Sequence, residues 1–187
     1  MPFAANLEAY RAVLAKVDAF AAATASRRGG DMRCRSGCDG CCHMELEVSP
    51  IEAAFVRLAV EALAPAARAR MAARAVDGRR HRCAMLEEDG RCGIYASRPT
   101  VCRTQGLPLR YPSDFVPIET VAGKSGEDDV VWCSLNFTEG PPEGADVLDA
   151  ERVDTLVGLA NQGYCEPHDL DPLSRIPLRS LAKARER

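Results

Sequence analysis

The sequence predicts a mostly α-helical fold with small β elements (α+β), in a chain of 187 residues. Apolar residues recur with helical spacing in several stretches, whereas strand-like runs are few and short. Two segments rich in cysteine interrupt this pattern, and we expect their backbone to be irregular. Together these three observations favour a compact cysteine-rich domain of the α+β class.

Four stretches have the pattern of helices. The first spans about residues 6–25, before the break at residues 27–30. The second begins with clear signals, because Ser49 fits the N-cap, Pro50 the first turn and Glu52 a capping box. We expect this helix to run to about residue 63. The third should span residues 65 to about 77, and the fourth about 149–161 with Asp149 as its cap.

The rest of the chain predicts only short strands. Residues 107–147 are rich in Pro, Gly and Asp, with strand-like pieces at 115–121 and 130–135. The polar end, residues 181–187, should fray. Because we find no repeat and no low-complexity linker, we expect a single domain over residues 1–187. Residues 34–105 would form its cysteine-cluster core, and residues 106–187 a C-terminal extension packed on that core.

Charge and hydropathy exclude several classes of protein. The formal net charge is −3, whereas a dedicated nucleic-acid binder usually has a strong basic excess. No stretch reaches the roughly 18 apolar residues that a membrane-spanning helix needs. The first residues lack the basic and apolar regions of a signal peptide. We therefore expect a cytoplasmic protein that binds neither nucleic acid nor membrane; the sequence leaves a protein partner and the oligomeric state open.

The nine cysteines are the main chemical signal of the sequence. In a reducing compartment such a density rarely means disulfides, and an odd number fits a disulfide framework poorly. Metal ligation or a redox-active dithiol is the better interpretation.

The first cysteine-rich segment places four thiols within nine residues, namely Cys34, Cys38, Cys41 and Cys42. Gly37 and Gly40 lie between them, where tight turns are needed. The Cys38-x-x-Cys41 loop lets two sulfurs reach one metal. Since adjacent side chains diverge, Cys41 and Cys42 would serve different metals, or one of the two would face the core.

The second cysteine-rich segment contains Cys83, Cys92 and Cys102. Asp89-Gly90 predicts a turn that returns a short hairpin and brings Cys83 near Cys92. Two readings of Arg98 and Arg103 stay open, since they would either offset thiolate charge or lie on the surface as ordinary arginines.

The ordered motifs across residues 34–105 resemble the YkgJ-type cysteine-cluster family, a zinc- or iron-chelating domain. They are Cys38-x-x-Cys41-Cys42, Ser49-Pro50-x-Glu52, Cys83-x-x-Leu86, and Gly90-Arg91-Cys92-x-Ile94-Tyr95-x-x-Arg98-Pro99-x-x-Cys102-Arg103. The resemblance implies that the metal ligands, or close neighbours of the metal, are Cys34, Cys38, Cys41, Cys42, Cys83, Cys92 and Cys102. A flagellin lysine N-methylase carries a similar cysteine cluster, but this chain has no glycine-rich loop that would support methyl transfer.

The thiol spacing favours an iron–sulfur cluster, most simply [4Fe–4S], over zinc. A cluster takes four thiolates and spreads them over a larger object than one ion, which suits the scattered spacing. Zinc would take four ligands in a closed tetrahedron, so eight cysteines would make two sites. Copper(I) is a minor alternative. The chain lacks the strand–helix alternation of radical SAM enzymes, although its first three cysteines share their cluster spacing.

Several further residues have open interpretations. Cys133 would either complete a site or be a core thiol, whereas Cys165 is expected to begin a polar loop rather than a separate cluster of hard ligands. His43 and His81 are expected to be polar neighbours of the site rather than ligands. The arginines between residues 68 and 82 are expected to form a solvated helix face rather than an anion site.

The sequence is compatible with three functions. The first is a binding module that stores, delivers or senses metal, and the second is an enzyme or electron carrier with an iron–sulfur centre. The third is a structural zinc domain that presents a protein-binding surface. The sequence assigns no catalytic residue and no loop for an organic cofactor.

Overall fold

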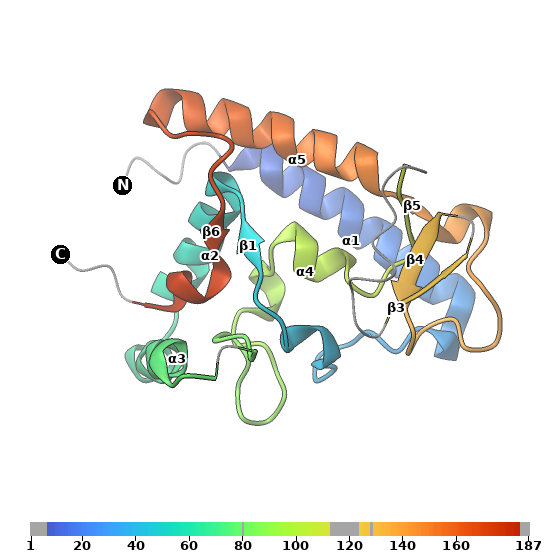
Figure 1. The fold of residues 1–187 in the computed structure, drawn as a ribbon, viewed down its shortest axis with the longest axis horizontal. Helices are drawn as coiled ribbons and strands as arrows, with labels where there is room; N and C mark the ends of the chain where they lie inside the picture. The colour runs from blue at the N-terminus through green and yellow to red at the C-terminus, as the bar shows by residue number, and fades with distance from the viewer. Residues whose placement is uncertain (1–6, 80, 113–123, 128, 184–187) are drawn as a thin grey trace. The chain divides into compact units, whose positions relative to one another are not determined.

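A computed structural model describes residues 7–79, 81–112, 124–127 and 129–183 (Figure 1). Its α-helices are α1 (Glu8–Arg28), α2 (Pro50–Glu61), α3 (Pro65–Val76), α4 (Thr100–Thr104) and α5 (Ala150–Cys165). Its strands are β1 (Glu47–Val48), β2 (Leu109–Arg110), β3 (Lys124–Glu127), β4 (Val130–Cys133), β5 (Leu148–Asp149) and β6 (Ile176–Pro177). Helices therefore dominate and the strands are short, which confirms the predicted fold class.

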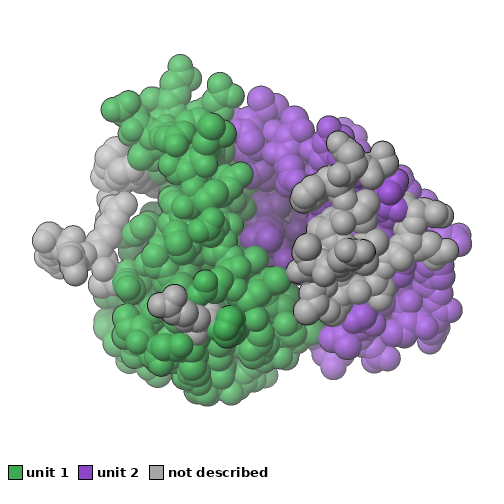
Figure 2. Space-filling view, in the orientation of Figure 1, with its two compact units in different colours: residues 1–10, 36–99, 160–187 green, residues 11–35, 100–159 purple. Residues whose placement is uncertain are grey.

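The chain divides into two compact units, shown in different colours in Figure 2. Unit 1 consists of residues 1–10, 36–99 and 160–187, and unit 2 of residues 11–35 and 100–159. The expectation of a single domain with residues 34–105 as its core stays a prediction. Among the described residues, no helix is both long and apolar enough to cross a membrane.

In unit 1, the capping box predicted for the second helix is present. The carboxylate of Glu52 accepts hydrogen bonds from the backbone N–H of Ser49 at 3.0 Å and from its hydroxyl at 2.9 Å. The hydroxyl of Tyr10 donates a third bond, at 3.2 Å, to the same carboxylate. Because these bonds satisfy a buried charged group, they fix the start of α2. The helix ends at Glu61, two residues before the expected end.

In unit 1, residues 176–182 near the C-terminal end are ordered rather than frayed, whereas residues 184–187 lie outside the described part of the chain. Strand β6 pairs antiparallel with β1, and the backbone N–H of Leu178 donates to the carbonyl oxygen of Leu46 at 2.8 Å. The 3₁₀ helix of residues 178–182 then buries Leu181 and Ala182. The expectation of fraying was therefore wrong for these two residues, because their apolar side chains pack into the core.

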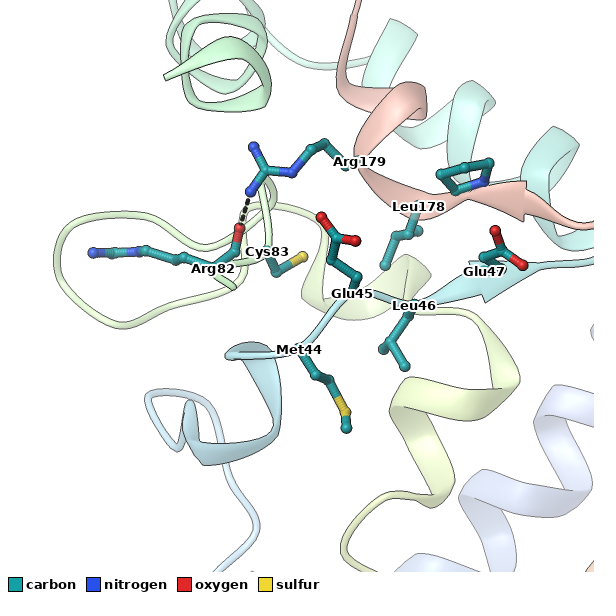
Figure 3. A pocket seen from close by; sticks show the side chains of 9 residues that line it. Met44, Glu45, Leu46, Glu47, Arg82, Cys83, Leu178 and Arg179 are labelled. Atoms are coloured by element: carbon teal, nitrogen blue, oxygen red, sulfur yellow. Dashed lines mark hydrogen bonds between the residues drawn. The ribbon is translucent and has the colours of Figure 1, made fainter. Parts of the chain in front are cut away.

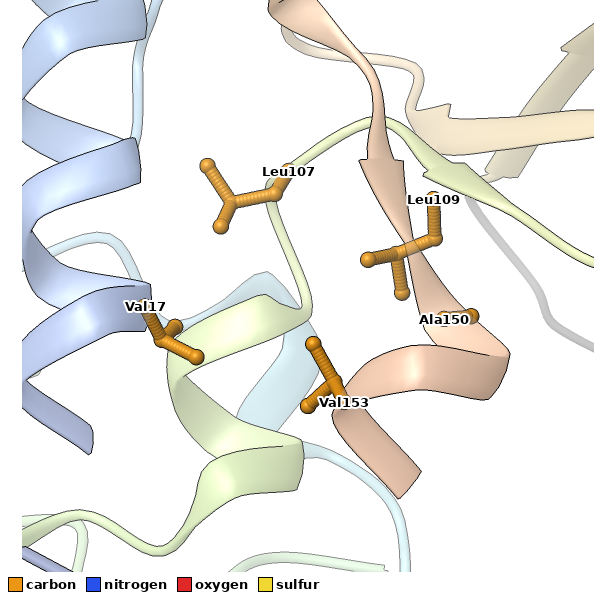
Figure 4. Packing of buried hydrophobic residues seen from close by; sticks show 5 residues of the cluster. All are labelled: Val17, Leu107, Leu109, Ala150 and Val153. Atoms are coloured by element: carbon orange, nitrogen blue, oxygen red, sulfur yellow. The ribbon is translucent and has the colours of Figure 1, made fainter. Parts of the chain in front are cut away.

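Unit 2 is built around a four-stranded sheet in the order β3-β4-β2-β5. Strand β2 pairs antiparallel with β4 and parallel with β5. The sheet and helices α1 and α5 share a core, drawn in Figure 4, of Val17, Leu107, Leu109, Ala150 and Val153.

Two sequence predictions in unit 2 are confirmed and one lies outside the described residues. The carboxylate of Asp149 accepts the backbone N–H of Arg152 at 2.9 Å, so it caps α5 as predicted. That helix continues to Cys165, four residues beyond the expected end. The strand expected at 130–135 is present as β4, whereas the one expected at 115–121 lies outside the described residues.

Candidate metal centre

The first cysteine-rich segment folds in unit 1 as a tight loop, residues 38–42, called here the 38–42 loop. Gly37 enters it with a φ of +95°, a backbone conformation that favours glycine. Residues 40–42 form one turn of 3₁₀ helix, in which the backbone N–H of Cys42 donates to the carbonyl oxygen of Asp39 at 2.8 Å. All three thiols of this loop are half-buried. The irregular backbone expected here is present.

The second cysteine-rich segment forms the hairpin that the sequence predicts; residues 83–92 are called here the 83–92 hairpin. An antiparallel bridge joins Leu86 to Cys92, and the backbone N–H of Glu87 donates to the carbonyl oxygen of Arg91 at 2.8 Å. Gly90 makes the turn with a φ of +79°. The hairpin brings its two cysteines, eight intervening residues apart in sequence, to the same region of unit 1.

A backbone hydrogen bond joins the loop to the hairpin. The N–H of Cys83 donates to the carbonyl oxygen of Cys42 at 2.8 Å. Cys41, Cys83 and Cys92 are close enough to interact electrostatically, since Cys41 raises the pKa of both Cys83 and Cys92, and Cys83 raises the pKa of Cys92. Two segments about 40 residues apart in the sequence thus place thiols together in unit 1.

Burial raises the pKa of both hairpin cysteines. For Cys83, backbone N–H groups and the positive charge of Arg179 oppose the burial without cancelling it. For Cys92, the backbone N–H of Ile94 and the charge of Arg98 act in the same way. Buried thiols that also repel one another as thiolates gain from a bound cation, which stabilises the deprotonated form. Soft sulfur atoms that face backbone N–H groups fit a thiophilic metal.

Arg98 has the role that the charge-offset interpretation assigned to it. The guanidinium of Arg98 lies 3.7 Å from the centre of the Tyr95 ring and donates to the Tyr95 carbonyl oxygen at 3.1 Å. From there its charge lowers the pKa of Cys92 against the effect of burial. Arg103 belongs to unit 2, where it pairs with Asp18.

The arginines of α3 and the following turn support the hairpin. Arg74 is buried and donates to the carbonyl oxygen of Ala84 at 3.0 Å and to both carboxylate oxygens of Glu87 at 2.9 and 3.1 Å. Arg82 donates to the carbonyl oxygen of Glu87 at 2.8 Å. The expectation of a solvated helix face is therefore wrong for Arg74, since its charge is buried and paired. Helical spacing alone does not reveal a partner 13 residues away.

Sequence reasoning missed Arg179, which lies outside every motif. One of its terminal nitrogens donates to the carbonyl oxygen of Arg74 at 2.8 Å, and the other donates to the carbonyl oxygens of Arg79 and Arg82. Arg179 thereby holds the turn that leads into Cys83. Arg179 reaches this turn because it follows β6, which pairs with β1 far away in the sequence.

A pocket of about 630 Å³ opens beside Cys83 in unit 1 (Figure 3). The Met44–Glu47 segment lines it on one side and residues 177–179 on another, and Arg82 and Cys83 complete it. A small molecule in this pocket would therefore reach the neighbourhood of the Cys83 thiol.

The other candidate ligands lie in unit 2. Cys102 is half-buried on α4, and Cys133 is half-buried at the end of β4. The sulfur of Cys34 lies against Gly106, where it accepts a hydrogen bond from the side chain of Asn136 at 3.6 Å. No motif in the sequence identifies Asn136, which follows Cys133 by three residues.

The remaining candidates are explained without a metal. Cys165 is 1% exposed at the end of α5 and donates to the side-chain oxygen of Asn161 at 3.6 Å, so it is a core thiol and not part of a polar loop. His43 contacts Asp39 at 3.3 Å on the surface, and His81 is exposed. All nine cysteines lie among the described residues, and none of them is in a disulfide. Across the described residues, no three Cys, His, Asp or Glu side chains converge as ligands for a metal ion.

Comparison with known proteins supports metal binding. Residues 33–119 match the CxxCxxCC family, described as a putative zinc- or iron-chelating domain. No curated protein and no solved structure matches the chain. The match covers seven of the nine cysteines, including every residue of the 38–42 loop and the 83–92 hairpin. Residues 33–119, a little under half of the chain, are thus similar to the CxxCxxCC family.

Proposed function

We propose that this protein holds a thiolate-ligated metal centre, and that the centre is an iron–sulfur cluster, most simply [4Fe–4S]. The proposed ligands are the seven cysteines of the family match: Cys34, Cys38, Cys41, Cys42, Cys83, Cys92 and Cys102. The observation that carries the proposal is the hydrogen bond between Cys83 and Cys42, which brings the thiols of two distant segments together. A reduced thiol cluster of this kind belongs in the cytoplasm.

Two features support iron–sulfur rather than zinc. Cys34, Cys38 and Cys41 are separated by three and then two residues, a spacing that suits three corners of a cubane cluster. Cys83 and Cys92 come from a hairpin and Cys102 from a separate short helix, so the set as a whole spans a long stretch of chain. In unit 1, Arg98 and Arg179 supply positive charge beside the thiols, as a cluster of net negative charge requires.

A structural zinc domain is the alternative. Half-buried thiols backed by main-chain N–H groups also suit a closed tetrahedral zinc site, and Cys133 would supply an eighth ligand for two such sites. In that case the protein is an interaction module, and metal binding contributes directly to its folding.

The deciding experiment is the elemental content and visible spectrum of anaerobically purified protein. About four irons per chain with matching sulfide, and a brown solution, are expected for the iron–sulfur centre. About one or two zinc ions and a colourless solution would establish the zinc alternative. Protein that retains neither iron nor zinc after anaerobic purification would contradict both.

A further inference from the structure

One buried side chain, that of Asn136, reaches three segments of unit 2. It is 1% exposed. Its carbonyl oxygen accepts the backbone N–H of Arg33 at 2.6 Å, and its amide nitrogen donates to the carbonyl oxygen of Gly106 at 2.7 Å. The same nitrogen donates to the sulfur of Cys34 at 3.6 Å. Asn136 therefore connects the backbone before Cys34, the segment that follows α4, and its own turn after β4.

The orientation of this amide does not depend on the sulfur contact. The N–H of Arg33 can only donate, and the carbonyl of Gly106 can only accept, so the side-chain oxygen of Asn136 must face the first and the nitrogen the second. An amide nitrogen has two hydrogens, and Gly106 takes one of them. The second hydrogen is then left for the sulfur of Cys34.

The sulfur of Cys34 packs closely against the backbone of Gly106. A Cβ atom at Gly106 would lie 1.9 Å from that sulfur, so only glycine leaves room for it. The backbone N–H of Phe137 donates to the carbonyl oxygen of Asp31 at 3.0 Å, which ties the turn of Asn136 to the chain before Cys34. Phe137 adopts a left-handed conformation, with a φ of +57°, to make this turn. Such local strain persists only where the surrounding contacts over-determine it.

We propose that Asn136 is a positioning residue of the metal centre: its amide holds the sulfur of Cys34 in place and donates an N–H···S hydrogen bond to it when it ligates the metal. The inference rests on the proposed function, because it takes Cys34 as a ligand. It goes beyond the family match, since Asn136 lies outside residues 33–119. Hydrogen bonds to ligating groups orient them and tune the metal, and their loss typically costs 10- to 100-fold in metal affinity.

Asn136→Asp tests the proposal, because it keeps the size of the side chain and replaces the donating nitrogen with an accepting oxygen. The measurement is the chelator concentration that removes half of the metal from the anaerobically purified protein, followed by elemental analysis. We expect this concentration to fall about 10- to 100-fold. Thermal unfolding of the metal-free variant measures any loss of stability separately. If Asn136→Asp does not fold, Asn136→Ala is used in its place.

The matched control is Asn161→Asp in unit 1. Asn161 is also buried, at 3% exposure; it accepts a backbone N–H from Ile51 at 3.1 Å, donates to the carbonyl oxygen of Pro172 at 2.9 Å and contacts the sulfur of Cys165 at 3.6 Å. Its cysteine is a core thiol and not a proposed ligand. Asn161→Asp should therefore lower the stability of the metal-free protein without changing chelator resistance.

Combining Asn136→Asp with Cys34→Ser distinguishes a positioning role of Asn136 from an effect on general stability. If Asn136 acts through Cys34, then Asn136→Asp should change chelator resistance by less than about twofold in the Cys34→Ser protein. If Asn136 acts only on general stability, then Asn136→Asp should lower chelator resistance in Cys34→Ser as much as it does in the parent protein. Full additivity, or unchanged chelator resistance in Asn136→Asp alone, would overturn the inference. The proposed ligand set fails in a different way, namely if Cys34→Ser by itself retains all of its metal.

Discussion

The backbone N–H of Cys83 donates a hydrogen bond of 2.8 Å to the carbonyl oxygen of Cys42. This single contact joins the last residue of the 38–42 loop to the first residue of the 83–92 hairpin. It leaves both cysteine side chains to act as ligands, because only backbone groups make the bond. Loss of metal from either segment should therefore disturb the other.

Cysteines of the two segments should differ from the core cysteine in their effect on metal. Cys38→Ser, Cys42→Ser and Cys92→Ser should each lower metal content and the free energy of unfolding together, because metal binding is coupled to folding. The control is Cys165→Ser, whose side chain lies in the core and can still donate to Asn161. Its metal content should equal that of the parent protein. Full metal occupancy in all three ligand variants would refute the assignment.

Arg179→Ala should destabilise the protein and reduce its metal content. The substitution removes three hydrogen bonds to backbone carbonyl groups that precede Cys83, and one charged donor of this kind is worth about 1.5 to 3 kcal/mol. Chemical unfolding with and without metal measures the loss. Arg175→Ala is the control, since Arg175 is an exposed arginine four residues earlier in the same segment. Equal effects of the two substitutions would show that the charge of the segment matters and the contacts do not.

Gly106→Ala should displace the sulfur of Cys34. The added Cβ atom would lie 1.9 Å from that sulfur, well inside contact distance, so the side chain of Cys34 must move. We expect chelator resistance to fall by about tenfold or more, as for a lost orienting contact. Gly140→Ala provides the matched control, because a Cβ atom there meets nothing within 4 Å. Elemental analysis after graded chelator treatment measures both, and equal retention of metal would argue against Cys34 as a ligand.

The stability of the metal-free protein should fall at acid pH through Asp146. Burial alone would raise the pKa of this carboxyl, but hydrogen bonds from Arg27 and Arg28 outweigh it and hold the pKa below 3.8. A lowered pKa contributes stability above about pH 3.8 that is lost as the pH falls through the lower, folded value. Asp146→Asn should flatten this part of the curve of unfolding free energy against pH. A slope that Asp146→Asn leaves unchanged would exclude Asp146 as its source.

Local sequence signals predicted the elements that carry the candidate ligands. The turn at Gly90 and the capping box of Ser49 and Glu52 are present because a few neighbouring residues determine each of them. The seven cysteines of the family match could likewise be named from spacing and motif. Local patterns did not identify Arg74 as buried, because its partners Ala84 and Glu87 lie on the hairpin, beyond the range of helical spacing.

The sequence by itself determined the fold class, the cysteine segments and the similarity of residues 33–119 to the CxxCxxCC family, since each depends on composition and on short-range spacing. Only the tertiary structure decided which residues surround the thiols. Arg179 reaches the turn before Cys83 through the pairing of β6 with β1, and Asn136 reaches Cys34 through the turn after β4. The physical reason is that a hydrogen bond depends on distance in space, and long-range packing brings together residues about 100 positions apart in the chain.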